Sequence, residues 1–185
     1  MIIELTDDEK KESEIFAENS IKTHSYYKFR NQRDPKTIQN QIAIGKKGEI
    51  GVLKWLRKQN IECSNIDFTV TENKSFKPDI MIDKNIACHV KSQSNESALK
   101  YSKSWTFQYS GKGAGHLDKD IFLDYGENDF VVFCIIENGN VEICARIPIS
   151  ELHRLGLFKE PLKDSLKGIK KVVYLKDIPT KYLLN

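Results

Sequence analysis

The stretch that decides the fold runs from Pro78 to Lys91 and has the sequence PDIMIDKNIACHVK. Apolar residues alternate on both sides of residues 83–85, which predicts two strands joined by a tight turn. A three-residue turn, with Asn85 in the left-handed conformation that Asn tolerates, separates the apolar side chains from the polar ones. One face of the hairpin then carries Ile80, Ile82, Ile86, Cys88 and Val90, and the other carries Asp79, Met81, Ala87, His89 and Lys91. A two-residue turn mixes these sets, so we favour the three-residue turn.

The polar face of this hairpin brings a carboxylate, an imidazole and an ammonium group together (Asp79, His89 and Lys91). A carboxylate beside a lysine on paired strands suits a divalent cation that is held against a phosphate. An ordinary amphipathic hairpin with a solvated charged face explains the same pattern. The hairpin alone therefore leaves both interpretations open.

The composition is that of a globular protein with one core. Hydrophobic residues make up 39% and charged residues 30% of the 185 residues, and no apolar run approaches the ~20 residues of a membrane span. The acidic start of the chain lacks the apolar core of a signal peptide. The four cysteines form no CxxC pair and fall mostly in apolar strand patterns. We therefore expect reduced core thiols, no structural zinc, no membrane association and a cytoplasmic location.

The net charge of +3 is unevenly placed along the chain. Residues 1–20 carry −5, residues 21–60 carry +8, and acids and bases balance in the remainder. The basic segment also contains aromatic residues near Arg30 and Arg33, which is typical of a surface that faces a polyanion. The solvated faces of two helices give the same composition, so both interpretations stay open.

Local signals predict helices first and strands afterwards. Thr6 and Glu9 form a capping box, which predicts a helix from about Asp7 to Tyr27 or beyond. Asp34 followed by Pro35 predicts a second helix that ends near residue 59. Further along, we expect strands over residues 62–70 (at an edge), 78–82, 86–92, 104–108, 129–136, 141–147 and 171–175, a short helix after residue 148, and otherwise a polar loop over 93–118.

This order of elements predicts an α+β (mixed α/β) protein. We expect an N-terminal helical arm over residues 1–33 and one globular domain over residues 34–185. Asn138-Gly139, between two of the apolar runs, is a strong hairpin signal.

One carboxylate, Glu49, falls in the middle of the apolar stripe of the second predicted helix. At helical spacing, that stripe contains Ile38, Ile42, Gly45, Glu49, Val52 or Leu53, and Leu56. Burying a carboxylate is costly without a partner, so Glu49 needs a cation or a metal ion there. Gly48 and Gly51 flank it and allow the helix to approach a sheet or a substrate closely. Alternatively, Glu49 lies at the edge of the stripe and pairs with a lysine such as Lys46 or Lys54.

Taken together, these motifs resemble the PD-(D/E)xK nuclease superfamily. The resemblance rests on GKKGEIG at residues 45–51, on Pro78-Asp79 and on HVKSQ at residues 89–93. They follow one another as in restriction-type enzymes and Holliday-junction resolvases. The resemblance covers about residues 34–93, and more weakly the strands within residues 129–147. It implies a restriction-endonuclease-like fold, with a central mixed sheet flanked by helices.

The resemblance also implies a metal-dependent endonuclease that hydrolyses DNA phosphodiester bonds with Mg²⁺ or Mn²⁺. By position, Asp79 binds the metal ion directly, and Glu49 binds the same ion or a second one, or holds a metal-bound water. Lys91 orients or helps to deprotonate the attacking water and stabilises charge on the phosphate, and Gln93 orients the water or a phosphate. The expected contacts to DNA are the basic residues Arg30, Arg33, Lys46, Lys47, Lys100, Lys103 and Lys112. Family analogy further suggests a homodimer and an origin in a phage or mobile element.

His89 departs from the family pattern, which has Asp or Glu as a metal ligand at this position. His89 either binds the metal ion and shifts the preference toward Mn²⁺, or acts as a general base or phosphate contact. In a third outcome, the site is inactive and only binds DNA. The rivals to a deoxyribonuclease are therefore a catalytically inactive DNA-binding or assembly protein on the same fold, and a nuclease acting on RNA.

Overall fold

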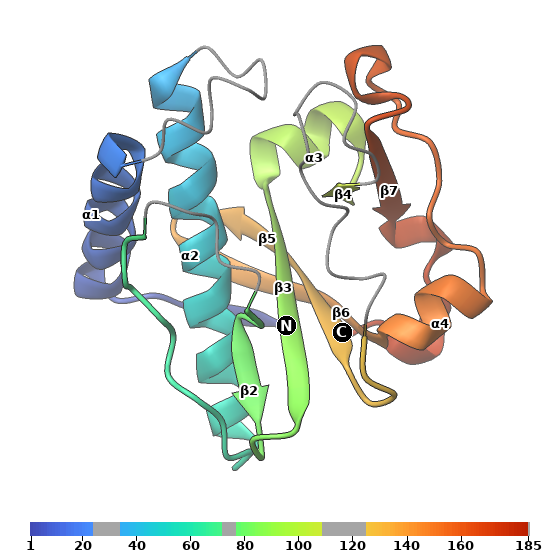
Figure 1. The fold of residues 1–185 in the computed structure, drawn as a ribbon, viewed down its shortest axis with the longest axis horizontal. Helices are drawn as coiled ribbons and strands as arrows, with labels where there is room; N and C mark the ends of the chain where they lie inside the picture. The colour runs from blue at the N-terminus through green and yellow to red at the C-terminus, as the bar shows by residue number, and fades with distance from the viewer. Residues whose placement is uncertain (24–33, 72–76, 109–124, 185) are drawn as a thin grey trace.

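A five-stranded mixed sheet forms the centre of the molecule (Figure 1). The computed structural model describes residues 1–23, 34–71, 77–108 and 125–184. The strands follow the order β1-β6-β5-β3-β2 across the sheet. Their bounds are β1 Ile2–Glu4, β2 Ile80–Ile82, β3 Ile86–Ser94, β5 Phe130–Glu137 and β6 Asn140–Pro148. β3 and β5 run parallel, and the other neighbouring strands are antiparallel. The predicted α+β class is confirmed.

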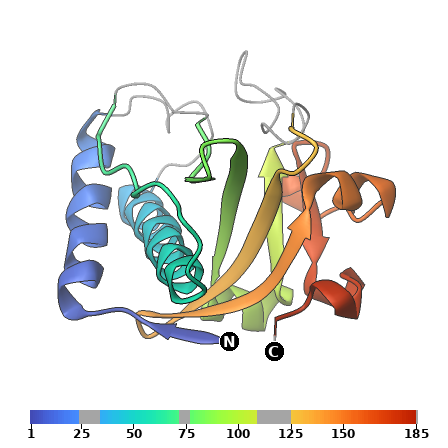
Figure 2. The same ribbon diagram turned by 90° about the horizontal axis from the view of Figure 1, so that it is seen from below.

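Different elements cover the two faces of this sheet (Figure 2). The helices are α1 Asp7–Thr23, α2 Pro35–Lys58, α3 Asn95–Tyr101 and α4 Ile149–Arg154. α2 packs directly on one face, with α1 outside it. A two-stranded sheet, β4 Ser104–Gln108 with β7 Lys170–Tyr174, lies on the other face together with α4. Short 3₁₀ helices follow at Asp164–Leu166, Leu175–Asp177 and Thr180–Tyr182. Each face of the sheet has its own hydrophobic cluster. Alternate side chains of the central strands therefore point to opposite clusters.

Both predicted helix starts are confirmed by side-chain caps. The backbone N–H of Thr6 donates to Glu9 Oε2 at 2.7 Å, and the N–H of Glu9 donates to Thr6 Oγ1 at 3.2 Å. The carboxylate of Asp34 accepts from two backbone N–H groups of the first turn of α2, each at 3.2 Å. α1 is described as far as Thr23, so its predicted extension toward Tyr27 lies outside the described residues.

The hairpin of β2 and β3 has the predicted register. Its Cα partners are Ile80 with Cys88, Met81 with Ala87, and Ile82 with Ile86. The predicted conformation of Asn85 is wrong, because Asp83 (φ 46°) and Lys84 (φ 64°) take the left-handed conformation instead. The N–H of Asn85 then donates to the carbonyl of Ile82 at 3.1 Å and closes the turn. The Asn138-Gly139 turn between β5 and β6 is confirmed, with φ values of 51° and 79°.

Three elements differ from the predictions. Residues 62–70 form no strand and only an isolated bridge between Cys63 and Ile82, because after Ser64 the chain leaves β2 and lines a pocket. Part of the predicted polar loop is α3, whose N-cap Ser94 accepts from the N–H of Ser97. β1 was not predicted, since three residues carry too little periodicity.

Three of the four thiols that were expected in the core are buried. Cys88, Cys134 and Cys144 are buried, Cys63 is partly buried, and all four cysteines are free thiols. Trp105 on β4 is buried, stacks on Phe133 and donates its indole N–H to the carbonyl of Cys134 at 2.9 Å. Among the described residues, no helix has the length and apolar character to cross a membrane.

Candidate functional site

A pocket of about 440 Å³ lies between α1, α2 and the chain that leads into β2. Two carboxylates from different elements share it, Glu49 from α2 and Asp79 from the residue just before β2. Lys46 from α2 and Phe16 from α1 form further parts of its wall. The pocket therefore contains two of the predicted catalytic residues, Glu49 and Asp79. It also contains Lys46, which was predicted only as a DNA contact, and part of α1, which was predicted as a separate arm.

Glu49 is largely buried and is paired with Lys46. The Lys46 Nζ atom lies 2.6 Å from Glu49 Oε2, and the two side chains are 11% and 15% exposed. The same ammonium group donates to the backbone carbonyl of Asp67 at 2.8 Å. Both alternatives considered for Glu49 thus hold in part, because it is buried and its cation is a neighbouring lysine of the same helix.

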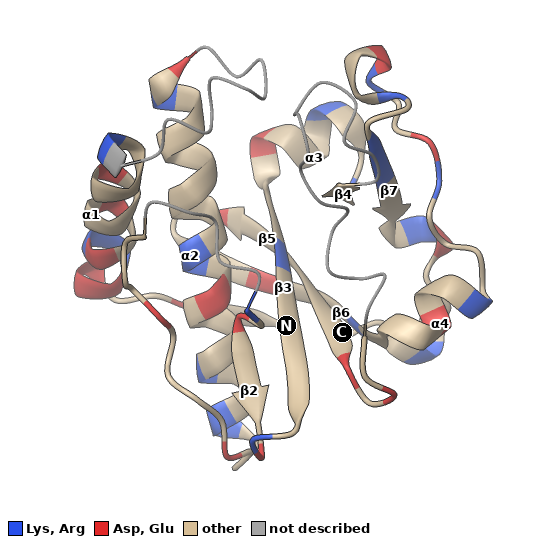
Figure 3. Ribbon diagram, viewed as in Figure 1, with Lys and Arg blue, Asp and Glu red and all other residues tan. Residues whose placement is uncertain are grey.

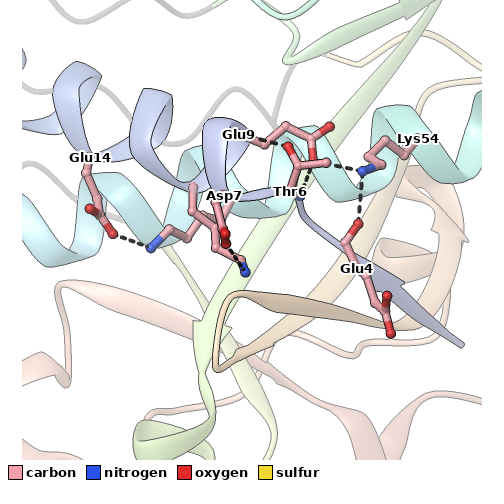
Figure 4. Close-up of polar contacts among 8 residues, drawn as sticks. Glu4, Thr6, Asp7, Glu9, Glu14 and Lys54 are labelled. Atoms are coloured by element: carbon pink, nitrogen blue, oxygen red, sulfur yellow. Dashed lines mark hydrogen bonds and ion pairs between the residues drawn. The ribbon is translucent and has the colours of Figure 1, made fainter.

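Lys54, the other lysine considered for Glu49, has a different partner. Its Nζ atom contacts Glu9 Oε2 at 2.7 Å and the carbonyl of Glu4 at 2.9 Å (Figure 4). Lys46 and Lys54 each contact one carboxylate oxygen and one backbone carbonyl oxygen. Lys46 does so inside the pocket, whereas Lys54 joins α2 to α1 and β1.

The carboxylates of the pocket disfavour one another's charge. Burial raises the pKa of Glu49 to about 8, the negative charge of Asp79 adds to this, and Lys46 acts in the opposite direction. A carboxyl group with such a pKa keeps its proton at neutral pH. A metal ion that binds Glu49 must therefore displace that proton.

Asp79 is oriented by the edge of β3. Its Oδ2 atom accepts from the backbone N–H of Val90 at 2.7 Å. β2 begins only at Ile80, so Asp79 lies outside the strand ladder and is not bound to the alternation of the pleat. Its carboxylate lines the pocket beside Glu49.

His89, Lys91 and Gln93 lie on the opposite face of β3. Their register partners on β5 are Val131, Phe133 and Ile135, which belong to the hydrophobic cluster on the side of β4. The predicted single face for Asp79, His89 and Lys91 is therefore wrong. The strand alternation was assigned correctly within β2 and β3, but it does not extend to the residue before β2.

These three residues have local surroundings of their own. Lys91 Nζ lies 5.0 Å from the ring centroid of Phe107, and His89 is 6% exposed. Gln93 accepts from the N–H of Ser104 at 2.8 Å and donates to the carbonyl of Ser102 at 3.1 Å. Gln93 thus fixes the start of β4 and does not line the pocket.

The predicted DNA contacts are dispersed. Lys47 pairs with Glu14 at 3.0 Å, and Lys103 pairs with Glu142 at 2.7 Å. Lys100 lies over the ring of Tyr101. Three further predicted contacts lie outside the described residues, namely Arg30, Arg33 and Lys112.

Acidic residues gather on α1 (Figure 3), and two of them bind lysines of α2, as Figure 4 also shows. Part of the predicted acidic segment therefore pairs with part of the predicted basic segment inside the protein. α1 lies close to α2 because small side chains face inward, with Ser13, Ala17 and Ser20 buried. This spacing of small residues is a sequence signal that could have placed α1 against the pocket.

The donor atoms of the pocket fit a hard divalent cation. Within residues 1–23, 34–71, 77–108 and 125–184, no three His, Cys, Asp or Glu side chains form a group that could hold a metal ion. Mg²⁺ in enzymes usually keeps several waters and takes one or two carboxylates together with substrate phosphates. Glu49 and Asp79 could supply that pair, and oxygen donors suit Mg²⁺ and Mn²⁺ alike.

Comparison with family models, with curated proteins and with solved structures finds no match to this chain.

The metal-free protein should lose stability as pH rises through the range in which Glu49 resists ionisation. In the unfolded chain this carboxyl has a pKa near 4.5, and in the folded protein about 8. Between these values the folded state holds a proton that the unfolded state has released, so the free energy of unfolding falls with pH. In urea unfolding with EDTA, Glu49→Gln should flatten this fall between about pH 5 and pH 8.

Glu9→Gln is the matched control for this measurement. Although burial acts in the opposite direction, Lys54 and Thr6 lower the pKa of Glu9. Its removal therefore should not flatten the fall between pH 5 and pH 8. A wild-type pH dependence that Glu49→Gln leaves unchanged would contradict the assigned shift.

Proposed function

We propose that the protein is a divalent-metal-dependent endonuclease that hydrolyses DNA phosphodiester bonds in the pocket between α1, α2 and the start of β2. The observation that carries the proposal is the meeting of Glu49 and Asp79 in that pocket, beside Lys46. Supporting it, the helix with Glu49, the strand after Pro78-Asp79 and the strand with Lys91 follow in the order that the nuclease resemblance implies. We accordingly propose a restriction-endonuclease-like fold.

Glu49 and Asp79 are the proposed ligands of Mg²⁺ or Mn²⁺. Such an ion, when bound, neutralises charge on the phosphate and makes water a better nucleophile. Glu49 is presented by a helix, which is a rigid support, and Asp79 is oriented by the N–H of Val90. The Oδ2 atom of Asp79 accepts that hydrogen bond, which leaves the Oδ1 atom as the proposed metal ligand.

DNA is the proposed substrate because the pocket combines its carboxylates with lysines. Lys46 and Lys77 both line it. Lysines near a phosphate backbone provide affinity that does not depend on sequence. The homodimer implied by the resemblance stays a prediction, and sedimentation velocity measures it directly.

A second candidate is a catalytically inactive DNA-binding protein on the same fold. The observation that favours it is the position of His89 and Lys91 on the face of β3 away from the pocket, where their register partners on β5 belong to the second hydrophobic cluster. In this reading, the pocket holds a phosphate or a metal ion and no bond is broken.

Plasmid cleavage distinguishes the two candidates. The purified protein is incubated with supercoiled plasmid in Mg²⁺, in Mn²⁺ and in EDTA, with an RNA duplex in parallel. We expect nicked or linear plasmid with a metal ion and intact plasmid in EDTA. DNA binding in a gel-shift assay without cleavage in either metal would favour the inactive binding protein. Cleavage of RNA alone would make the protein a ribonuclease.

A further inference from the structure

We propose that Lys46 is an exchangeable counter-ion of the pocket. Its ammonium group contacts Glu49 in the metal-free protein, and it moves to the substrate phosphate when a divalent cation binds the ionised Glu49 carboxylate. This inference rests on the proposed function and gives Lys46 the phosphate contact that the nuclease resemblance assigns to Lys91.

Lys46 occupies a position built for a cation. Its Nζ atom lies 4.6 Å from the ring centroid of Phe16 and 5.4 Å from that of Phe68, and the two rings meet edge to face at 5.8 Å. Glu49 Oε2 and the carbonyl of Asp67 complete its surroundings at 2.6 and 2.8 Å. Aromatic faces and oxygen acceptors both attract an ammonium group, which offsets the cost of removing it from water.

A divalent cation that binds Glu49 must compete with this ammonium group. Two cations beside the same carboxylate repel each other, and the repulsion is stronger here because the Lys46 and Glu49 side chains are largely buried. Lys46 has a flexible four-carbon stem, so it can leave Glu49 without any movement of α2. A substrate phosphate that enters the pocket would offer the released ammonium group a new, negatively charged acceptor.

The charges of the pocket balance after such an exchange. Ionised Glu49 and Asp79 together with one phosphodiester carry −3, which a divalent cation and Lys46 neutralise. Asp67 and Lys77 carry opposite charges among the residues that line the same pocket. Lys91 does not line the pocket, and its ammonium group lies over Phe107 on the other side of β3.

The first test measures Mn²⁺ affinity without DNA, by electron paramagnetic resonance of the unbound ion. With Glu49 ionised, Lys46→Met should bind Mn²⁺ at least about tenfold more tightly than the wild type, because the competing charge is gone. Lys54→Met is the matched control, since Lys54 lies on the same helix and also binds one carboxylate and one backbone carbonyl (Figure 4). Its Mn²⁺ affinity should equal that of the wild type. Unchanged or weaker binding by Lys46→Met would overturn the proposal.

The second test measures plasmid cleavage at saturating metal. Lys46→Met should cleave at least about 100-fold more slowly, despite its tighter metal binding, because the phosphate loses its cationic contact. Lys46→Arg, which keeps the charge, should recover part of the rate. Full activity of Lys46→Met would overturn the transfer to phosphate.

Two further outcomes keep this inference separate from the proposed function. If the wild type cleaves no nucleic acid, the nuclease proposal fails, and the Mn²⁺ affinities still decide whether Lys46 competes for Glu49. If Lys46→Met does not fold, Phe16→Leu takes its place, because it loosens the ammonium group and keeps its charge. Phe16→Leu should bind Mn²⁺ more tightly than the wild type, and an unchanged affinity would overturn the proposal.

Discussion

Asp79→Asn will lower the rate of plasmid cleavage by at least about 100-fold and leave the protein folded. The Asn side chain has nearly the same shape as Asp, and its carbonyl oxygen can still accept the N–H of Val90 that now donates to Asp79 at 2.7 Å. What disappears is the negative charge that would hold a divalent cation. Loss of a residue that merely supports a metal ligand costs about 10- to 100-fold, so loss of the ligand charge itself should cost at least as much.

Asp129→Asn is the matched control for this experiment. Asp129 Oδ1 also accepts a backbone N–H of β3, that of Ala87, at 2.8 Å. It does not line the pocket. Initial rates of plasmid cleavage should therefore stay within about twofold of wild type in Asp129→Asn, with circular dichroism as the check on folding. If both variants lose activity to the same extent, β3 needs its edge contacts for stability alone, and Asp79 is not a ligand.

The register of the hairpin was predictable because strand alternation is a local property. Ile80, Ile82 and Cys88 are all buried in one cluster, as the pattern of apolar residues requires. The starts of α1 and α2 were predictable for a similar reason, since capping side chains act on N–H groups within three residues of themselves. These features need no knowledge of the rest of the fold.

The position of Asp79 was not predictable from the same pattern. Its direction depends on where the pairing of β2 ends, and that end is set by the surrounding structure. Extending the alternation by one residue placed Asp79 with His89 and Lys91. The structure instead has Asp79 beside Glu49, on the side of β3 that faces α2. Two of the five predicted catalytic residues, Glu49 and Asp79, are therefore gathered in one pocket, and the other three lie across the sheet.

Glu49 shows what a sequence can and cannot say about a buried charge. A carboxylate inside an apolar stripe requires a partner, and Lys46 was one of the named alternatives. The aromatic walls around that lysine come from Phe16 and Phe68, which are far apart in the chain and close only after folding. No spacing rule connects them, so the cation site became visible only in the structure.

Gly51→Ala will lower the free energy of unfolding by about 1–3 kcal/mol, although Ala is the better helix former. A Cβ atom at Gly51 would lie 2.6 Å from Val141 Cβ and 2.7 Å from Val141 Cγ1. Val141 is fully buried on β6, so it has no room to move and α2 must shift away from the sheet. Urea unfolding followed by circular dichroism measures the loss.

Gly45→Ala tests the same substitution on the same helix without the contact. Nothing lies within 4 Å of a Cβ atom built at Gly45, so this variant should gain up to about 1 kcal/mol. Val141→Ala should recover part of the stability of Gly51→Ala, because it removes two of the crowded atoms. If Gly51→Ala and Gly45→Ala were equally stabilising, α2 could not lie as close to β6 as described. The distance matters for the site too, because a displaced α2 would carry Glu49 away from Asp79.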